Sequence, residues 1–104
     1  MHGYVVVLIT VPKGKGEELT RFIVENKLGA CVNRVPSVSS LYWWRGQIES
    51  DEEELLVVKT SSEKFKELLT RVKEVHPYTV PEIIALPIVA GNPDYLSWID
   101  ESLK

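Results

Sequence analysis

The feature that most constrains the fold of this chain is the order of its strand-like and helix-like segments. Runs rich in β-branched residues alternate with segments whose apolar side chains recur at helical spacing, and no linker separates them. In chain order the predicted elements are a strand at 4–11, a helix at 17–28, strands at 30–46 and 47–60, a second helix that ends before Pro77, a strand at 82–90, and a last helix that starts after Asn92.

This order predicts one architecture. Parallel strands need long crossovers, whereas antiparallel neighbours can be joined by a tight turn. Two right-handed crossovers joined by one hairpin give an α/β (α+β) ferredoxin-like sandwich of the split βαβ type, with helices on one face of a four-stranded antiparallel sheet. Pro87 indicates an edge position or a strand end for the last strand. We expect a single domain, 1–104, whose other sheet face has no cover from this chain.

Local signals predict where the elements begin and end. Gly29 stands where the end of the first helix would favour glycine. The hairpin turn is predicted at Arg45-Gly46-Gln47, with Ser50-Asp51 as the competing choice. Thr60 has Glu63 three residues further on, an arrangement in which each side chain bonds the other's backbone N–H, so the second helix is expected to start there.

Charge and cysteine content disfavour several classes of protein. The net charge of −3 lacks the basic footprint of a nucleic-acid binder. Cys31 is the single cysteine, so no intrachain disulfide can form, which fits a reducing compartment. The apolar run at 4–9 is too short for a membrane span or a signal-peptide core. We therefore expect a cytoplasmic, soluble protein with no nucleic-acid or membrane partner.

Motifs that support catalysis are missing from the sequence. It has no nucleophile elbow, P-loop, HExxH or paired CxxC pattern. Its two histidines are His2 and His76, and Cys31 with His76 is the one nucleophile–base pair that it offers. Nothing in the sequence places these two residues together, and a small buried hydrophobe is the favoured interpretation of Cys31. We predict that the protein is not an enzyme.

Two charged segments have both a binding and a structural interpretation. Residues 13–16 (KGKG) lie where backbone N–H groups can hold phosphate, but their spacing matches no phosphate motif and a solvated turn is favoured. The acidic run at 49–54 offers oxygen ligands for hard cations, although a solvated hairpin face is favoured there too. Glu54 is the exception, because it lies where the acidic run meets the apolar strand and is a candidate to face a cleft.

His76 closes the predicted second helix. An imidazolium there would interact favourably with the helix C-terminus. Imidazole is also a ligand for copper, zinc and nickel, and the thiolate of Cys31 suits Cu(I). One histidine cannot make a tight site alone, so the other ligands would come from Cys31 or from another subunit. His76 and Cys31 are therefore the candidate metal ligands.

Tyr42, Trp43 and Trp44 are three consecutive aromatic residues on an extended segment. Strand alternation sends Trp43 to one face of the sheet and the other two to the opposite face. One set can enter the core beneath the helices, and the other points to the uncovered face, where a large aromatic patch usually marks an interface. We therefore predict an oligomer that is held together through these three residues.

Several short motifs in this chain resemble those of the CutA divalent-cation-tolerance family, in the same order and over roughly residues 4–103. The motifs that carry the resemblance are Ala30-Cys31-Val32-Asn33, Tyr42-Trp43-Trp44 with Gly46 and Ile48, Lys59-Thr60, His76-Pro77-Tyr78, Pro81-Glu82-Ile83 and Tyr95-Leu96-x-Trp98-Ile99. The combination is far more specific than any single motif above.

The resemblance implies a ferredoxin-like subunit in a tight homotrimer with the architecture of PII signalling proteins, in which the second and third strands pair with neighbouring subunits. The family is associated with tolerance to copper and other divalent metal ions and is described as copper-binding, and no enzymatic reaction is firmly attached to it. His76 matches the histidine that is linked to metal ligation. Val75 before it and Ile9 in the first strand leave a cysteine- and histidine-rich site only partly reproduced.

The resemblance also implies clefts between subunits, lined here by Trp43, Glu54, Lys59, Tyr78 and Glu82. Such a group can bind a small anion or a metal chelate, or it can be a structural ion-pair network, which is the favoured interpretation. The predicted function is a trimeric divalent-cation-tolerance protein that binds copper or another divalent cation in the response to metal ions. The alternative is a PII-like signalling trimer that binds a small metabolite in the same clefts.

Overall fold

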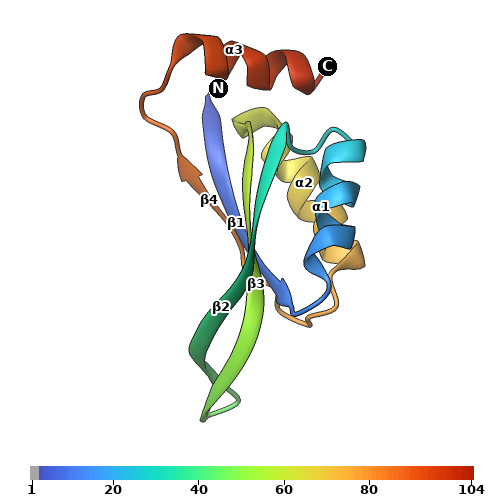
Figure 1. The fold of residues 1–104 in the computed structure, drawn as a ribbon, viewed down its shortest axis with the longest axis vertical. Coiled ribbons are helices and arrows are strands. Elements are labelled where there is room, and N and C mark those ends of the chain that lie inside the picture. The colour runs from blue at the N-terminus through green and yellow to red at the C-terminus, as the bar shows by residue number, and fades with distance from the viewer. Residues whose placement is uncertain (1–2) are drawn as a thin grey trace.

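The computed structural model describes residues 3–104, so His2 lies outside the described residues. It shows a four-stranded antiparallel sheet with α1 and α2 on one face and α3 across one end (Figure 1). The elements are β1 (Tyr4–Pro12), α1 (Gly16–Glu25), β2 (Cys31–Trp44), β3 (Gln47–Ser61), α2 (Ser62–Val75), β4 (Ile83–Pro87) and α3 (Pro93–Ser102). The strand order β2-β3-β1-β4 confirms the predicted fold, and β4 with Pro87 at its end lies at an edge.

The core lies between the sheet and the two helices α1 and α2. Alternate side chains of β1 point into it, and their neighbours on the other face are only half-buried. Each fully buried aliphatic side chain stabilises the fold by about 2 kcal/mol relative to an exposed one. The buried cluster consists of Val5, Val7, Ile9, Val11, Leu19, Ile23, Leu28, Leu56, Val58, Leu68 and Val72.

The end of α1 differs from the prediction that Gly29 would terminate it. The helix ends at Glu25, and Lys27 takes the left-handed backbone conformation with φ of 57°. The backbone N–H of Leu28 donates to the carbonyl of Ile23 at 2.9 Å, and both of these side chains are fully buried. The chain turns early because Leu28 enters the core. Gly29 is needed for another reason, since a Cβ there would lie 2.5 Å from Cγ1 of Val58.

The start of α2 also differs from the prediction. Ser61, not Thr60, is the N-cap, and its Oγ accepts from the backbone N–H of Lys64 at 3.2 Å. Thr60 is fully buried, and its hydroxyl donates to the carbonyl of Leu28 at 2.8 Å. Strand alternation turns Thr60 toward the helices, which leaves the capping position to the next residue.

β2 and β3 form a long hairpin whose distal part extends beyond both helices as an arm (Figure 1). Arg45 and Gly46 connect the strands, both with positive φ (51° and 80°), as a two-residue hairpin turn requires. The predicted turn is confirmed, and the competing choice, Ser50-Asp51, lies inside β3. A bulge between Val35 and Val38 interrupts the pairing of β2 with β3.

The three consecutive aromatic residues lie on this arm, and the expectation that one set enters the core beneath the helices is wrong. Tyr42 pairs with Glu49 and Trp43 with Ile48, so the predicted alternation is present. However, the exposed fractions of Tyr42, Trp43 and Trp44 are 38%, 72% and 39%. The arm is longer than the helices that cover the sheet, so no core exists at this level for the side chains to enter.

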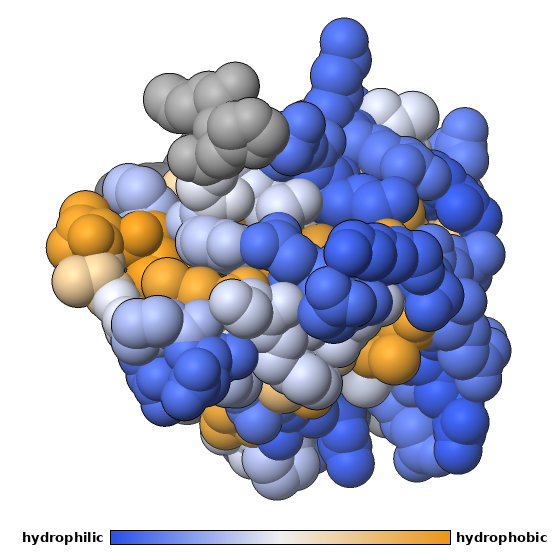
Figure 2. Space-filling model, turned by 90° about the horizontal axis from the view of Figure 1, so that it is seen from above, coloured by the Kyte–Doolittle hydropathy of each residue, from blue (hydrophilic) through white to orange (hydrophobic). Residues whose placement is uncertain are grey.

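Further hydrophobic surface lies on the side of β4. Seen from above, hydrophobic residues gather on the side where Figure 1 places β4 and the loop to α3, whereas the side of α1 and α2 is mostly hydrophilic (Figure 2). Ile84 and Leu86 of β4 and Val89 of the following loop are all exposed. No helix within residues 3–104 has the length and apolar character needed to cross a membrane.

Candidate functional site

The most distinctive polar group surrounds two adjacent glutamates of β3, at the point where the arm extends beyond the part of the sheet that the helices cover. In this strand Glu54, Leu56, Val58 and Thr60 face the helices, so Glu53 lies on the open face. Both glutamates are nevertheless buried, with exposed fractions of 6% for Glu53 and 4% for Glu54. The free-energy cost of burying a carboxylate must be offset by hydrogen bonds or by an opposite charge. The two glutamates differ in which of these they have.

Glu54 is compensated completely. One carboxylate oxygen accepts from the backbone N–H of Gly14 at 2.7 Å, and the other lies 3.1 Å from Nη1 of Arg34. The Gly14 N–H and then Arg34 hold the pKa of the Glu54 carboxyl below its usual range. The loop at 13–16 therefore binds an anion, as its backbone permits, but the anion is the chain's own glutamate.

Glu53 has no such partner in the part of the chain that the structure describes. It accepts a hydrogen bond from the hydroxyl of Tyr78 at 2.6 Å. Burial first, and then the carboxylate of Glu53, raise the pKa of Tyr78, so this phenol stays neutral. Burial and the charge of Glu53 also raise the pKa of Glu82. Within residues 3–104 neither Glu53 nor Glu82 has an ion-pair partner.

The same face continues onto the arm through a second tyrosine–carboxylate pair. The hydroxyl of Tyr42 donates to Asp51, and this bond raises the pKa of Tyr42 to about 12. The charge of Asp51 contributes to the raised pKa of Tyr78, which shows that the two pairs are neighbours. We call Tyr42, Asp51, Glu53, Tyr78 and Glu82 the acidic cluster. The side-chain atoms that it offers to a metal ion are all oxygen atoms, which suit hard divalent cations.

His76 adjoins the acidic cluster but is occupied by other contacts. Its Nε2 lies 2.8 Å from the carbonyl oxygen of Thr10, and its Nδ1 lies 3.1 Å from the backbone nitrogen of Tyr78. The residue follows the last turn of α2, as predicted, but burial lowers the pKa of its imidazole. The predicted imidazolium at the helix end is therefore disfavoured at neutral pH.

Cys31, the second candidate metal ligand, lies elsewhere. It pairs with Lys59, which in turn pairs with Val6, whereas His76 contacts Thr10 four residues further along β1. Four residues of strand span about 13 Å, so one chain does not bring Cys31 and His76 together. The thiol instead lies beside the hydroxyl of Tyr95 and contributes, after burial, to the raised pKa of that phenol. Among residues 3–104 no three His, Cys, Asp or Glu side chains are grouped to hold a metal ion.

The five residues predicted to line a cleft between subunits occupy several places on one chain. Tyr78 donates to Glu53 and Glu82 lies within electrostatic range of it, whereas Glu54 faces the helices. Lys59 donates to Asn33, and Trp43 is exposed on the arm. The cleft between subunits stays a prediction.

Sequence reasoning missed the role of Glu53 and the partnership of Arg34 with Glu54. Alternation through the apolar part of β3 contained one usable signal. With Leu56 and Val58 inward, Glu53 and Glu54 must lie on opposite faces. The contact between Arg34 and Glu54 depends on strand register, which no local pattern specifies.

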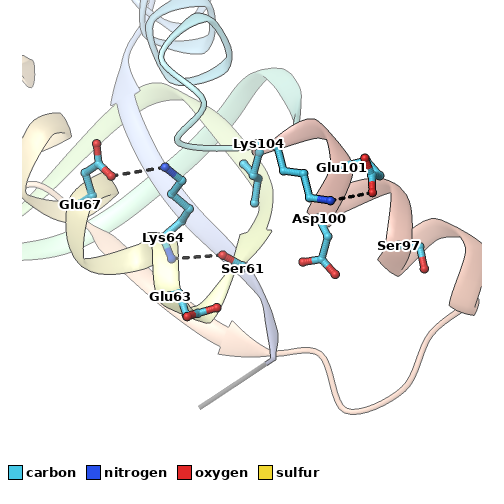
Figure 3. A pocket seen from close by; sticks show the side chains of 9 residues that line it. Ser61, Glu63, Lys64, Glu67, Ser97, Asp100, Glu101 and Lys104 are labelled. Carbon is cyan, nitrogen blue, oxygen red and sulfur yellow. Dashed lines mark hydrogen bonds and ion pairs between the residues drawn. The ribbon is translucent and has the colours of Figure 1, made fainter.

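A hollow of about 710 Å³ between α2 and α3 contains none of the predicted residues (Figure 3). Several of its charges are already paired, with Lys64 3.4 Å from Glu67 and Lys104 3.0 Å from Glu101. Asp100 accepts from the hydroxyl of Tyr4. These pairs indicate a solvated charged surface rather than a binding site.

Comparison with known proteins gives a consistent result. The family model of the CutA1 divalent ion tolerance protein matches residues 5–102. The divalent-cation tolerance protein CutA of Thermus thermophilus is 51% identical over 98 residues, which are 93% of this chain and 95% of that protein. The CutA of Archaeoglobus fulgidus is 43% identical over 105 residues and is covered completely. The chloroplastic CutA 1 of Oryza sativa is 48% identical over 101 residues, but this chain spans only 57% of its length.

Solved structures agree with the sequence comparison. The Cut A1 protein of Thermus thermophilus superposes with a TM-score of 0.92 at 50% identity, covering 95% of this chain and 97% of that one. The Archaeoglobus fulgidus structure, described as a periplasmic divalent cation tolerance protein, gives a TM-score of 0.91 at 42% identity over the full length of both chains. The fold, the motifs and these matches together place the chain in the CutA1 divalent ion tolerance family.

Proposed function

We propose that this protein binds divalent cations, copper among them, as a homotrimer, and that the cations bind at the acidic cluster. The observation that carries the proposal is the pair Glu53 and Glu82. Two buried or half-buried carboxylates lie close enough for the charge of one to raise the pKa of the other, and neither has an ion-pair partner within residues 3–104. A bound cation would remove this repulsion.

The proposal requires more than one subunit. Around Glu53 and Glu82 one chain offers these two carboxylates and the neutral phenol of Tyr78, and no three His, Cys, Asp or Glu side chains among residues 3–104 are grouped to hold an ion. A tight site therefore needs donors from a second copy. The arm beside the cluster projects three exposed aromatic side chains beyond the core, a surface that a neighbouring subunit would cover. The family's association with divalent ions supports the same function.

The cation site is tested by titrating Cu(II) and Mn(II) into wild type and the double variant Glu53→Gln/Glu82→Gln, with calorimetry as the readout. The amides keep the size of the side chains but remove both charges, so we expect a loss of affinity of at least tenfold. Glu52→Gln is the matched control, because Glu52 is an exposed neighbour of Glu53 on the same strand. Equal affinity for the double variant and the wild type would overturn the proposed site.

The trimer is tested separately by sedimentation velocity. Trp43→Ala/Trp44→Ala removes two exposed aromatic side chains from the arm, and we expect the trimer to dissociate while each subunit stays folded. An equally stable trimer would refute the role of the arm. The alternative function, binding of a small metabolite, predicts that a nucleotide raises the melting temperature in the absence of any cation. In both cases the proposed role is binding and not catalysis.

A further inference from the structure

The contacts of His76 determine which of its nitrogen atoms carries the proton. A backbone N–H can only donate, so Nδ1, which lies 3.1 Å from the nitrogen of Tyr78, must be the acceptor. A backbone carbonyl can only accept, so Nε2, which lies 2.8 Å from the oxygen of Thr10, must donate its hydrogen. The ring is thus a neutral imidazole with one defined tautomer, and both of its nitrogen atoms are in use.

These two bonds leave His76 with no lone pair for a metal ion. Ligation through Nδ1 would release the amide of Tyr78, and ligation through Nε2 would first require loss of its proton and of the bond to Thr10. The residue is only 8% exposed, so an ion would also have to reach it through covering side chains. The ligand pair predicted from the sequence, His76 with Cys31, therefore does not fit a metal ion within one chain.

The same contacts give His76 a different task. The imidazole joins β1, through Thr10, to the segment between α2 and β4, through the amide of Tyr78. The rings of His76 and Tyr78 are in contact, with centroids 4.9 Å apart. The hydroxyl at the far end of Tyr78 donates to Glu53 at 2.6 Å. A continuous line of contacts thus runs from the centre of the sheet through His76 and Tyr78 to Glu53.

We propose that His76 is not a metal ligand but a positioning residue, which fixes Tyr78 so that its hydroxyl holds the carboxylate of Glu53 in the acidic cluster. The effect on cation affinity rests on the proposed function. The contact between His76 and Tyr78 does not, because it is a hydrogen bond between two residues of the chain itself.

The first experiment separates a ligand from a positioning residue by a double-mutant cycle on Cu(II) affinity. We expect His76→Ala to weaken binding about tenfold, as removal of a residue that orients a ligand does. Tyr78→Phe should weaken it by a similar factor, because it removes only the hydroxyl that holds Glu53. If His76 acts through Tyr78, His76→Ala in the Tyr78→Phe background should cost less than twofold more. An additive loss of a further tenfold would overturn the proposal.

The second experiment observes the copper ligands directly. In a His2→Ala background His76 is the one remaining histidine, so any imidazole signal must come from it. Spin-echo spectroscopy of the Cu(II)-loaded variant should show no modulation from a remote imidazole nitrogen. Such modulation would show that His76 is a ligand and would overturn the proposal.

The third experiment needs no metal ion, so it remains decisive if the proposed function fails. His76→Asn places an amide oxygen where it can accept from the N–H two residues further on, whereas His76→Ala cannot. We expect hydrogen exchange of the Tyr78 amide to become at least tenfold faster in His76→Ala and to return close to the wild-type rate in His76→Asn. Unchanged exchange in His76→Ala, with the helices intact by circular dichroism, would overturn the proposal.

Discussion

Glu53 and Glu54 are neighbours in sequence, but the groups that surround their carboxylates are very different. Glu54, on the helix side of the sheet, meets the N–H of Gly14 and the guanidinium of Arg34, and its pKa is lowered. Glu53, on the open side, meets the neutral hydroxyl of Tyr78 and no cationic group among residues 3–104, and its charge raises the pKa of Glu82. The comparison shows that a structural carboxylate is one whose charge the fold has neutralised. A carboxylate whose charge is not balanced by a cation or an N–H group is a candidate for binding a ligand.

The largest effect on stability is expected from removing the carboxylate of Glu54, the structural one of these two glutamates. Glu54→Ala leaves the Gly14 N–H without an acceptor and Arg34 without its partner, which should lower the free energy of unfolding by about 2 kcal/mol. Urea unfolding at one fixed protein concentration measures it. Glu53→Gln is the matched control, because the amide oxygen can still accept from Tyr78, and its cost should stay below about 0.5 kcal/mol. Equal costs for the two variants would remove the distinction.

A smaller effect is expected from crowding Glu54 without removing it. A Cβ at Gly16 would lie 1.9 Å from Oε1 of Glu54 and 2.8 Å from Cδ of Arg34, so Gly16→Ala must displace the ion pair. We expect a loss of about 1 kcal/mol in the free energy of unfolding. In the Glu54→Ala background most of this cost should disappear, which a double-mutant cycle would reveal. A full cost in that background would show that the strain lies elsewhere.

The dependence of stability on pH provides a third comparison, between the wild type and a variant without the Glu54 charge. The pKa of Glu54 is lower in the folded chain than its ordinary value of 4.5, so the folded state binds fewer protons there. This stabilisation is present above that ordinary value and is lost as the pH falls through the lowered one. The loss should be smaller than that of Glu54→Ala, because a protonated carboxyl still accepts one hydrogen bond. Below pH 4.5 the stability curve of Glu54→Gln should therefore fall less steeply than that of the wild type.

The smallest effect has the opposite sign. The pKa of Glu82 is raised in the folded chain, so its ionisation destabilises the fold once the pH rises through that raised value. Glu82→Gln should therefore stabilise the metal-free protein at pH 7 by up to about 0.5 kcal/mol, although it weakens cation binding. Thermal unfolding with and without Cu(II) measures both changes. A destabilised metal-free variant would show that Glu82 has a stabilising partner.

The elements that the sequence predicts well are those specified by local chemistry. The order of strands and helices, the turn at Arg45-Gly46 and the start of the last helix after Asn92 all depend on residues within a few positions of each other. The errors arise where tertiary packing decides. Leu28 enters the core and ends α1 early, and Thr60 turns inward and leaves the cap to Ser61.

The candidate site was predictable only in part, for the same reason. Tyr78 and Glu82 stand out from their motifs, yet their proximity to Glu53 depends on how the segment after α2 folds back onto β3. One of the two hydrogen bonds of His76 is equally non-local, since its partner Thr10 lies 66 residues away in the sequence. A histidine two residues before a tyrosine in sequence gives no sign that its ring nitrogen atoms are already bonded.

The central place of β1 in the sheet bears on how the protein is made. β1 precedes both of its partners in the chain, since β3 begins at residue 47 and β4 at residue 83. During synthesis this apolar strand has no neighbour on one side until most of the chain has emerged, and none on the other side until the last strand does. The sheet therefore cannot be completed until β4 has left the ribosome, although β1 and β3 can pair before then. A truncated product that stops before β4 should aggregate rather than persist as a soluble intermediate.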